Sequence, residues 1–191
     1  MPTKQLEGKS MRVKIAVHSL VCIILFLAMP TLACGKSIIG GQVVAADTGK
    51  PIEGAAVYIY WGKSGSGPPG LAASSVEVET AEYLTDTEGL FKVPKYSTLF
   101  KRYRMAIYKK GYVCWSSKKI FPTYEERKGF SLKDGMVIKL EPFKGDYSKE
   151  DHANFTTTWS IGSRGLFDDA IKSEREIERD FIKKRRKEQG D

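Results

Sequence analysis

Few residues of this chain have the types and spacing that catalysis or metal binding requires. The 191 residues include two His and three Cys. A structural zinc site needs four nitrogen or sulfur ligands in closely spaced pairs, which these scattered residues do not provide. Asp86 and Glu88 lack the further oxygen ligands of a calcium loop, and we interpret them as turn residues. The sequence therefore predicts no bound metal and no cofactor.

His152 is the main candidate for acid–base chemistry, and its neighbour Asp151 could orient it as a carboxylate orients a catalytic histidine. The motifs of serine hydrolases and zinc proteases are missing from the sequence. Gly62-Lys63-Ser64 is not a phosphate-binding loop, because it lacks the upstream glycine of that motif. We therefore expect His152 to lie in a solvated loop and the chain not to be an enzyme. A hydrolase built around His152 stays a remote alternative.

Aromatic residues beside cations are the candidate ligand-binding residues. Tyr58 and Tyr60 alternate with apolar residues, as Tyr108 does further along, so all three would face away from the core. With Arg104 and Lys109 beside them, such rings could stack on the sugars of an anionic glycan or contact a lipid headgroup. The interpretation that we favour is that a C-terminal helix covers these tyrosines.

The first 33 residues have the pattern of a secretory signal peptide. Four cations precede an uncharged apolar run, residues 15–29, which is shorter than the roughly 20 residues of a membrane-spanning helix. Pro30 ends the run, and Ala33 supplies a small residue before the cleavage point. We predict a signal peptide over 1–33, with Met11 as an alternative start, and therefore an exported protein.

Cys34 follows the predicted cleavage point immediately, which resembles the lipidated cysteine of bacterial lipoproteins. The preceding Leu32 stands one place closer to the cysteine than is usual. We expect a lipid on Cys34 and a short tether over 34–36. The residue after Cys34 is Gly35, whereas an aspartate at this position would favour retention in the inner membrane. In this respect the sequence resembles outer-membrane lipoproteins of enteric bacteria. This predicts an outer-membrane anchor facing the periplasm or the surface.

Cys114 separates two interpretations of the N-terminus. If Cys34 carries a lipid, Cys114 is a lone thiol that we expect to be buried and inert. If cleavage is ordinary and Cys34 stays free, a Cys34–Cys114 disulfide can form in an oxidising compartment.

The charge of the chain, +8, and the cationic run at 183–187 would suit nucleic acid in another compartment. Because the chain is predicted to be exported, we expect no nucleic-acid partner. The expected partners are the membrane, through lipidated Cys34, and an envelope protein or an anionic glycan.

The elements that position these residues are mostly strands. Alternation with a period of two recurs from Ile39 to Glu141, with Gly- and Pro-rich turns between the runs. The pattern predicts an all-β domain over 37–142, a seven-stranded antiparallel Greek-key-like β-sandwich. A polar linker is expected over 143–165.

A C-terminal amphipathic helix is predicted over 166–188, because apolar residues recur there with a helical period. We expect its apolar residues to pack on the outer face of a sheet. These residues are Phe167, Ile171, Ile177 and Phe181.

Four short motifs of the strand region occur in a familiar order. They are Gly41-x-Val43, Pro51-x-x-Gly54-Ala55-x-Val57, Thr85-Asp86-x-x-Gly89-x-Phe91 and Gly111-Tyr112. Over residues 37–141 the chain resembles the carboxypeptidase regulatory-like family, whose members are transthyretin-like (prealbumin-like) sandwiches.

The resemblance implies a fold rather than an activity, and the matching residues are turn and core positions. We therefore expect a non-catalytic envelope lipoprotein whose sandwich is a structural or protein-interaction module. The alternative is a carbohydrate-binding module for envelope or extracellular polysaccharide.

Overall fold

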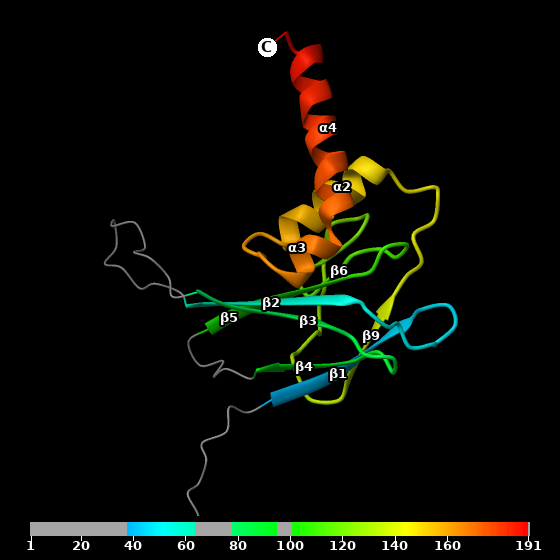
Figure 1. Cartoon of the computed structure of the whole chain (residues 1–191), viewed down its shortest axis with the longest axis vertical. Coiled ribbons are helices and arrows are strands. Elements are labelled where there is room, and N and C mark those ends of the chain that lie inside the picture. Colours follow the sequence, from blue (N-terminus) through cyan, green and yellow to red (C-terminus); the bar gives the residue numbers. More distant parts are fainter. Residues whose placement is uncertain (1–37, 64–77, 95–100, 191) are drawn as a thin grey trace, which may run out of the picture. The chain divides into compact units, whose positions relative to one another are not determined.

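The computed structural model describes residues 38–63, 78–94 and 101–190, and their strands form two sheets and a small ribbon (Figure 1). Sheet A has the order β4-β1-β9, and sheet B has the order β3-β2-β5-β6. The members of sheet A are β1 (Ile38–Ala45), β4 (Leu90–Pro94) and β9 (Met136–Leu140). Those of sheet B are β2 (Ala56–Lys63), β3 (Val78–Leu84), β5 (Lys101–Tyr108) and β6 (Trp115–Ser116). The ribbon pairs β7 (Lys119–Ile120) with β8 (Glu125–Glu126).

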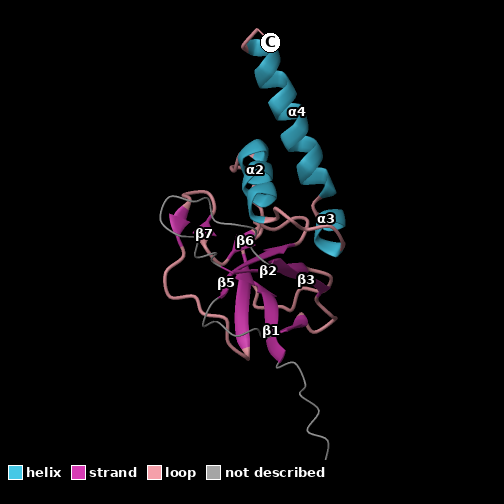
Figure 2. Ribbon diagram, turned by 90° about the vertical axis from the view of Figure 1, so that its left-hand side faces the viewer, coloured by secondary structure: helices cyan, strands magenta, loops and turns pink. Residues whose placement is uncertain are grey.

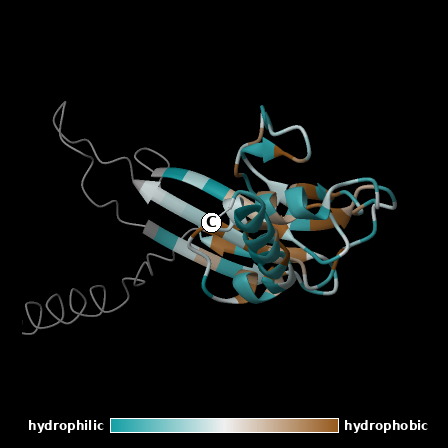
Figure 3. Cartoon of the chain, turned by 90° about the horizontal axis from the view of Figure 1, so that it is seen from above, coloured by the Kyte–Doolittle hydropathy of each residue, from teal (hydrophilic) through white to brown (hydrophobic). Residues whose placement is uncertain are grey.

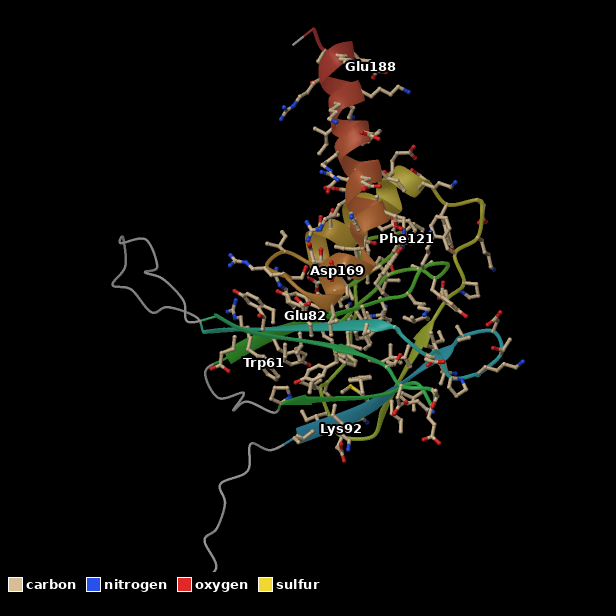
Figure 4. All side chains as sticks on the ribbon, viewed as in Figure 1. Trp61, Glu82, Lys92, Phe121, Asp169 and Glu188 are labelled. Atoms are coloured by element: carbon tan, nitrogen blue, oxygen red, sulfur yellow. The ribbon has the colours of Figure 1, made fainter. Side chains whose placement is uncertain are left out.

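The two sheets pack face to face around one apolar core. Alternate residues of each strand point inward, as the period of two predicts, and contributions from both sheets form one buried cluster. Trp61 of β2 lies between the sheets (Figure 4), and its ring centroid is 5.5 Å from that of Tyr103. The expected arrangement of two packed sheets, a β-sandwich, is confirmed.

Two glycines of the matching motifs allow close packing in sheet A. A Cβ at Gly41 would lie 2.5 Å from the Phe91 ring, so a side chain there would displace this core residue. Gly89 has φ +71°, and a Cβ there would clash with the Val43 carbonyl. Asp86 stabilises the same hairpin, because its Oδ1 accepts the backbone N–H groups of Glu88 (3.0 Å) and Leu90 (2.8 Å).

The strand count is a correction, because the described residues form nine strands rather than seven. The additional pair is the β7-β8 ribbon, which lies in the polar segment that the alternation pattern does not cover. Sheet A is also not wholly antiparallel, since β1 pairs in parallel with β9. Parallel pairing of these strands requires the long connection that runs through sheet B.

Three helices follow the last strand and form a layer on the outer face of sheet B (Figures 1 and 2). They are α2 (Lys149–Trp159), α3 (Leu166–Ala170) and α4 (Lys172–Glu188). A second buried cluster joins this layer to the sheet; its members include Tyr58, Tyr108, Phe155, Phe167 and Ile171. Among the described residues, no helix is both long and apolar enough to cross a bilayer.

The expected linker over 143–165 contains α2, which is a second correction. Three consecutive threonines weaken the helical signal there, because β-branched residues lose rotamer freedom in a helix. Their hydroxyls donate to backbone carbonyls four residues earlier, those of His152, Ala153 and Asn154. Ser148 caps the helix by accepting the Asp151 N–H at 3.1 Å.

The single helix predicted over 166–188 is interrupted at Ile171, which lies between α3 and α4. Phe167 and Ile171 are buried against the sheet as expected. Ile177 and Phe181 are only half-buried, because α4 packs against α2 and no residue of α4 is fully buried. The C-terminal part of α4 therefore leaves the sheet face.

Candidate functional site

The three candidate tyrosines lie on the outer face of sheet B, beneath the helical layer. Tyr58 is fully buried, its ring is 5.7 Å from that of Phe167, and its hydroxyl donates to the Ile161 carbonyl at 3.0 Å. Tyr108 is 2% exposed. Tyr60 is half-buried. The three rings therefore do not form the exposed row that stacking on a sugar requires, and the helical layer is the physical reason.

The candidate cations of the same face have internal partners. The Arg104 guanidinium stacks on the Tyr60 ring at 4.3 Å and donates to the Ile161 carbonyl at 2.8 Å. Lys109 donates to the Gly54 carbonyl at 3.4 Å. Arg104 and Lys109 therefore fix neighbouring segments, and neither faces an open ligand site with the tyrosines.

Glu82 of β3 positions the start of α3, although nothing in the sequence singles it out. Its two carboxylate oxygens accept the backbone N–H groups of Arg164 and Phe167, each at 2.9 Å. These N–H groups belong to the first turn of α3 and the loop before it, where a helix provides no backbone acceptor. Figure 4 shows Glu82 on the side of sheet B that faces the helices. One side chain thus ties the helical layer to the sheet.

His152 is the centre of a buried polar network that joins α2, α4 and sheet B. The residue is 3% exposed and does not lie in a solvated loop as the sequence suggests. Its Nε2 accepts the Cys114 backbone N–H at 2.9 Å, and its Nδ1 lies 3.5 Å from Glu174 Oε2. Glu174 Oε1 accepts the Tyr108 hydroxyl at 2.8 Å. We call Tyr108, Cys114, His152 and Glu174 the His152 network.

The hydrogen bonds define the protonation of His152. Because Nε2 accepts an N–H group, it carries no proton, and the proton of the neutral ring is on Nδ1. That Nδ1–H then points to Glu174. Phe121 and Phe143 surround the ring, with centroids 5.3 Å and 4.8 Å from that of His152. This apolar environment lowers the local polarity, which makes each polar pairing in the network important for stability.

Glu174 is held as a carboxylate by its neighbours. Burial by itself raises the pKa of this group, but hydrogen bonds from His152 and Tyr108 outweigh burial, and the pKa of Glu174 is lowered. The pKa of Tyr108 is raised by burial and by its hydrogen bond to Glu174, so its hydroxyl stays protonated and donates. The pair therefore has one stable arrangement of protons.

Cys114 is a buried thiol without a disulfide partner among the described residues, and its reactivity is suppressed. Burial raises its pKa to about 12, so the thiolate is scarce at neutral pH. A nucleophilic cysteine needs the opposite shift, which a protonated histidine at its sulfur provides. Here the contact from His152 is to the Cys114 backbone N–H instead. The possible partner Cys34 lies outside the described residues.

A pocket of about 290 Å³ opens beside the network, with His152 and Glu174 among its lining residues. Lys110, Tyr112 and Phe143 provide other parts of its wall. The polar atoms of His152 and Glu174 face each other and Cys114 and Tyr108. Within the described ranges, no three His, Cys, Asp or Glu residues gather as metal ligands would.

Comparison with known proteins gives only weak similarities. No family model and no curated protein sequence matches the chain, so the carboxypeptidase regulatory-like resemblance receives no support from that side. Among solved structures, 3-chlorocatechol 1,2-dioxygenase from Rhodococcus opacus 1CP aligns with a TM-score of 0.34 and 16% identity. The alignment covers 56% of this chain and 60% of the dioxygenase.

Two pilin structures also align over 56% of this chain. The C-terminal domain of shaft pilin spaA from Lactobacillus rhamnosus GG has a TM-score of 0.32 and 11% identity, with 97% of that domain covered. A streptococcal ancillary pilin has a TM-score of 0.29 and 17% identity, with 29% covered. Similarity this low assigns no function, and the β-sandwich rests on the strand pairing and the shared core described above.

Proposed function

We propose that the chain is an exported lipoprotein of the cell envelope whose sandwich and helical layer form a non-catalytic module for structure or protein interaction. The sandwich is taken to be of the carboxypeptidase regulatory-like type, on the motifs that include Gly41 and Gly89. Both glycines have the packing and turn roles that such a framework needs.

The His152 network carries the non-catalytic part of the proposal. A general base needs an unprotonated nitrogen that faces its substrate or a nucleophile, but Nε2 of His152 accepts the Cys114 backbone N–H and Nδ1 faces Glu174. The thiol of Cys114 is buried with a raised pKa, and Tyr108 already donates to Glu174. The His152 network therefore joins the helices to the sheet, although its residue types also occur in catalytic sites.

The anchor is supported by the N-terminal sequence alone. Cations, an apolar run that is short for a transmembrane helix, Ala33 and then Cys34 are the order found in lipoprotein precursors. These residues lie outside the described ranges, so an experiment has to test the anchor.

Mass spectrometry of the mature N-terminus tests the anchor. The full-length gene is expressed in a bacterial host, and the product is extracted with detergent. We expect the mature chain to begin at Cys34 with the added mass of a thioether-linked diacylglycerol. A Cys34→Ser variant should lose this mass. A chain that begins at an unmodified Cys34 would overturn the lipoprotein proposal.

A substrate panel tests the absence of catalysis. Fluorogenic esters, peptides and glycosides are incubated with the purified chain and with Cys114→Ala and His152→Asn variants. We expect no turnover above buffer for any of the three. Turnover by the chain that disappears in a variant with an unchanged circular dichroism spectrum would show an active site and overturn the proposal.

A further inference from the structure

The last turn and a half of α4 forms a cationic element that projects from the sandwich. We define the basic tip as five consecutive residues, Lys183, Lys184, Arg185, Arg186 and Lys187. All five are exposed. At a rise of 1.5 Å per residue, their Cα atoms span only about 6 Å of the helix axis. Figures 1 and 2 show this end of α4 beyond the layer that packs on sheet B.

The basic tip has no apolar side with which to pack on its own fold. Phe181 and Ile182 are the last apolar residues of α4, and every residue from 183 to 188 is charged. Figure 3 shows the ribbon of α4 in the colours of hydrophilic residues, and Figure 4 shows side chains standing free around Glu188. A helical segment that is polar on all sides lacks the packing that stabilises other helices.

The charge of the basic tip is left largely uncompensated by the described residues. Lys183 lies 3.7 Å from Asp180, and no other residue of the tip has an ion pair within those ranges. The carboxylates of Glu82 and Glu174 are instead engaged with the sheet and the helices. Like charges three and four positions apart on a helix repel, which the favourable position at the helix C-terminus only partly offsets.

We infer that the basic tip binds a linear anionic polysaccharide of the envelope. Cations distributed around a free helix suit a flexible polymer that can follow them, whereas a small ligand needs a shaped pocket. The opposite charge of such a polymer compensates the repulsion within the tip. The inference rests on the proposed export, because export removes nucleic acid as the polyanion.

The layer order separates the basic tip from the strand that follows the predicted anchor. The predicted anchor, Cys34, precedes Ile38, the first residue of β1, by four positions in the sequence. β1 belongs to sheet A, and the helices lie on the far side of sheet B (Figure 1). The basic tip therefore projects from the layer farthest from sheet A.

Binding to immobilised dextran sulfate, with neutral dextran as reference, tests the inference on the detergent-extracted full chain. The tip variant replaces Lys183, Lys184, Arg186 and Lys187 by Gln, which keeps a high helix propensity. Arg185 stays, because its guanidinium stacks on Phe181. A matched control removes the same charge from exposed lysines of the sandwich and its following loop, by Lys92→Gln, Lys133→Gln, Lys139→Gln and Lys144→Gln.

We expect the tip variant to lose at least tenfold in affinity and the control variant less than twofold. The slope of log affinity against log salt should fall by about 3 in the tip variant, because four released counterions are lost. Equal losses in both variants, or equal binding to neutral dextran, would overturn the inference. So would tighter tip-dependent binding to phosphatidylglycerol vesicles than to dextran sulfate. The mass of the mature N-terminus reports the anchor separately, so failure of one claim is distinguishable from failure of the other.

Discussion

Both ring nitrogens of His152 face a polar partner, the buried Cys114 N–H and the partly buried Glu174 carboxylate. A His152→Ala substitution would leave the Cys114 N–H and the Glu174 carboxylate without their partner. We expect a loss of about 2–4 kcal/mol in the free energy of unfolding. Urea denaturation measures this loss, with Lys144→Ala, an exposed substitution, as the control. A loss in His152→Ala no larger than in the control would contradict the network.

Glu174 should make the stability of the protein depend on acid pH. Its pKa is lowered in the folded state, so the unfolded chain binds its proton more readily. The stabilisation from Glu174 is therefore complete above its unfolded pKa, about 4.3, and is lost as the pH falls through the lower folded value. We expect Glu174→Gln to reduce the difference in stability between pH 7 and pH 3. Urea denaturation of both proteins between pH 3 and pH 7 measures this difference. Parallel curves of unfolding free energy against pH would refute the role of Glu174.

Cys114 should resist alkylation in the folded protein. With its pKa raised to about 12 and its side chain 2% exposed, the thiolate is scarce and iodoacetamide has no access. Peptide mass spectrometry after treatment at pH 8 should find the peptide that contains Cys114 unmodified. The same peptide from urea-unfolded protein is the positive control. Complete modification in the folded state would show that the helical layer opens readily.

At the scale of elements, the start of α3 depends on a single carboxylate, that of Glu82 in strand β3. Glu82→Gln replaces one acceptor oxygen by an NH₂ group that faces a backbone N–H of the helix start. We expect a loss of about 1–2 kcal/mol, with faster amide exchange in α3 than in β2. Glu88→Gln is the control, because that exposed side chain lies in the turn between β3 and β4 and its carboxylate has no hydrogen bond to a helix among the described residues. Unchanged exchange in α3 would contradict the role of Glu82.

The strands were predictable because apolar and polar residues alternate along them. Helix α2 was not predictable, because polar residues are part of its buried side. Trp61 and Ile138 occupy the core positions that a period of two assigns to them. In α2 the buried residues include His152 and Thr156, whose polarity conceals the side that packs. Ser148, followed three residues later by Asp151, was the available local signal, since it resembles a capping pair at a helix start.

The candidate site was beyond prediction because its members come from distant parts of the chain. Tyr108 and Glu174 are 66 residues apart, and Cys114 and His152 are 38 apart. Their meeting depends on how α2 and α4 lie on sheet B, and no local spacing encodes that arrangement. The burial of Tyr58 follows from the same helices, whose apolar residues Phe167 and Ile171 do carry a helical signal.

At the scale of the whole molecule, the basic tip should be dispensable for folding. A chain that ends at Ile182 lacks only residues that are exposed where the structure describes them. We expect its free energy of unfolding to stay within about 0.5 kcal/mol of that of the full chain. Thermal and urea denaturation measure this difference. A loss above 1 kcal/mol would show that the tip contributes to the fold as well as to binding.

The parallel pairing of β1 with β9 delays the completion of sheet A during folding. β1 is the first described strand in the sequence, and in sheet A it lies between β4 and β9. β9 is the last strand of the sandwich in the sequence. The bond from the Gly40 N–H to Asp134 Oδ1 joins residues 94 positions apart. Contacts this distant in sequence form slowly, because a long loop must close first. Sheet A therefore stays incomplete until β9, the last strand of the sandwich, is available to pair with β1.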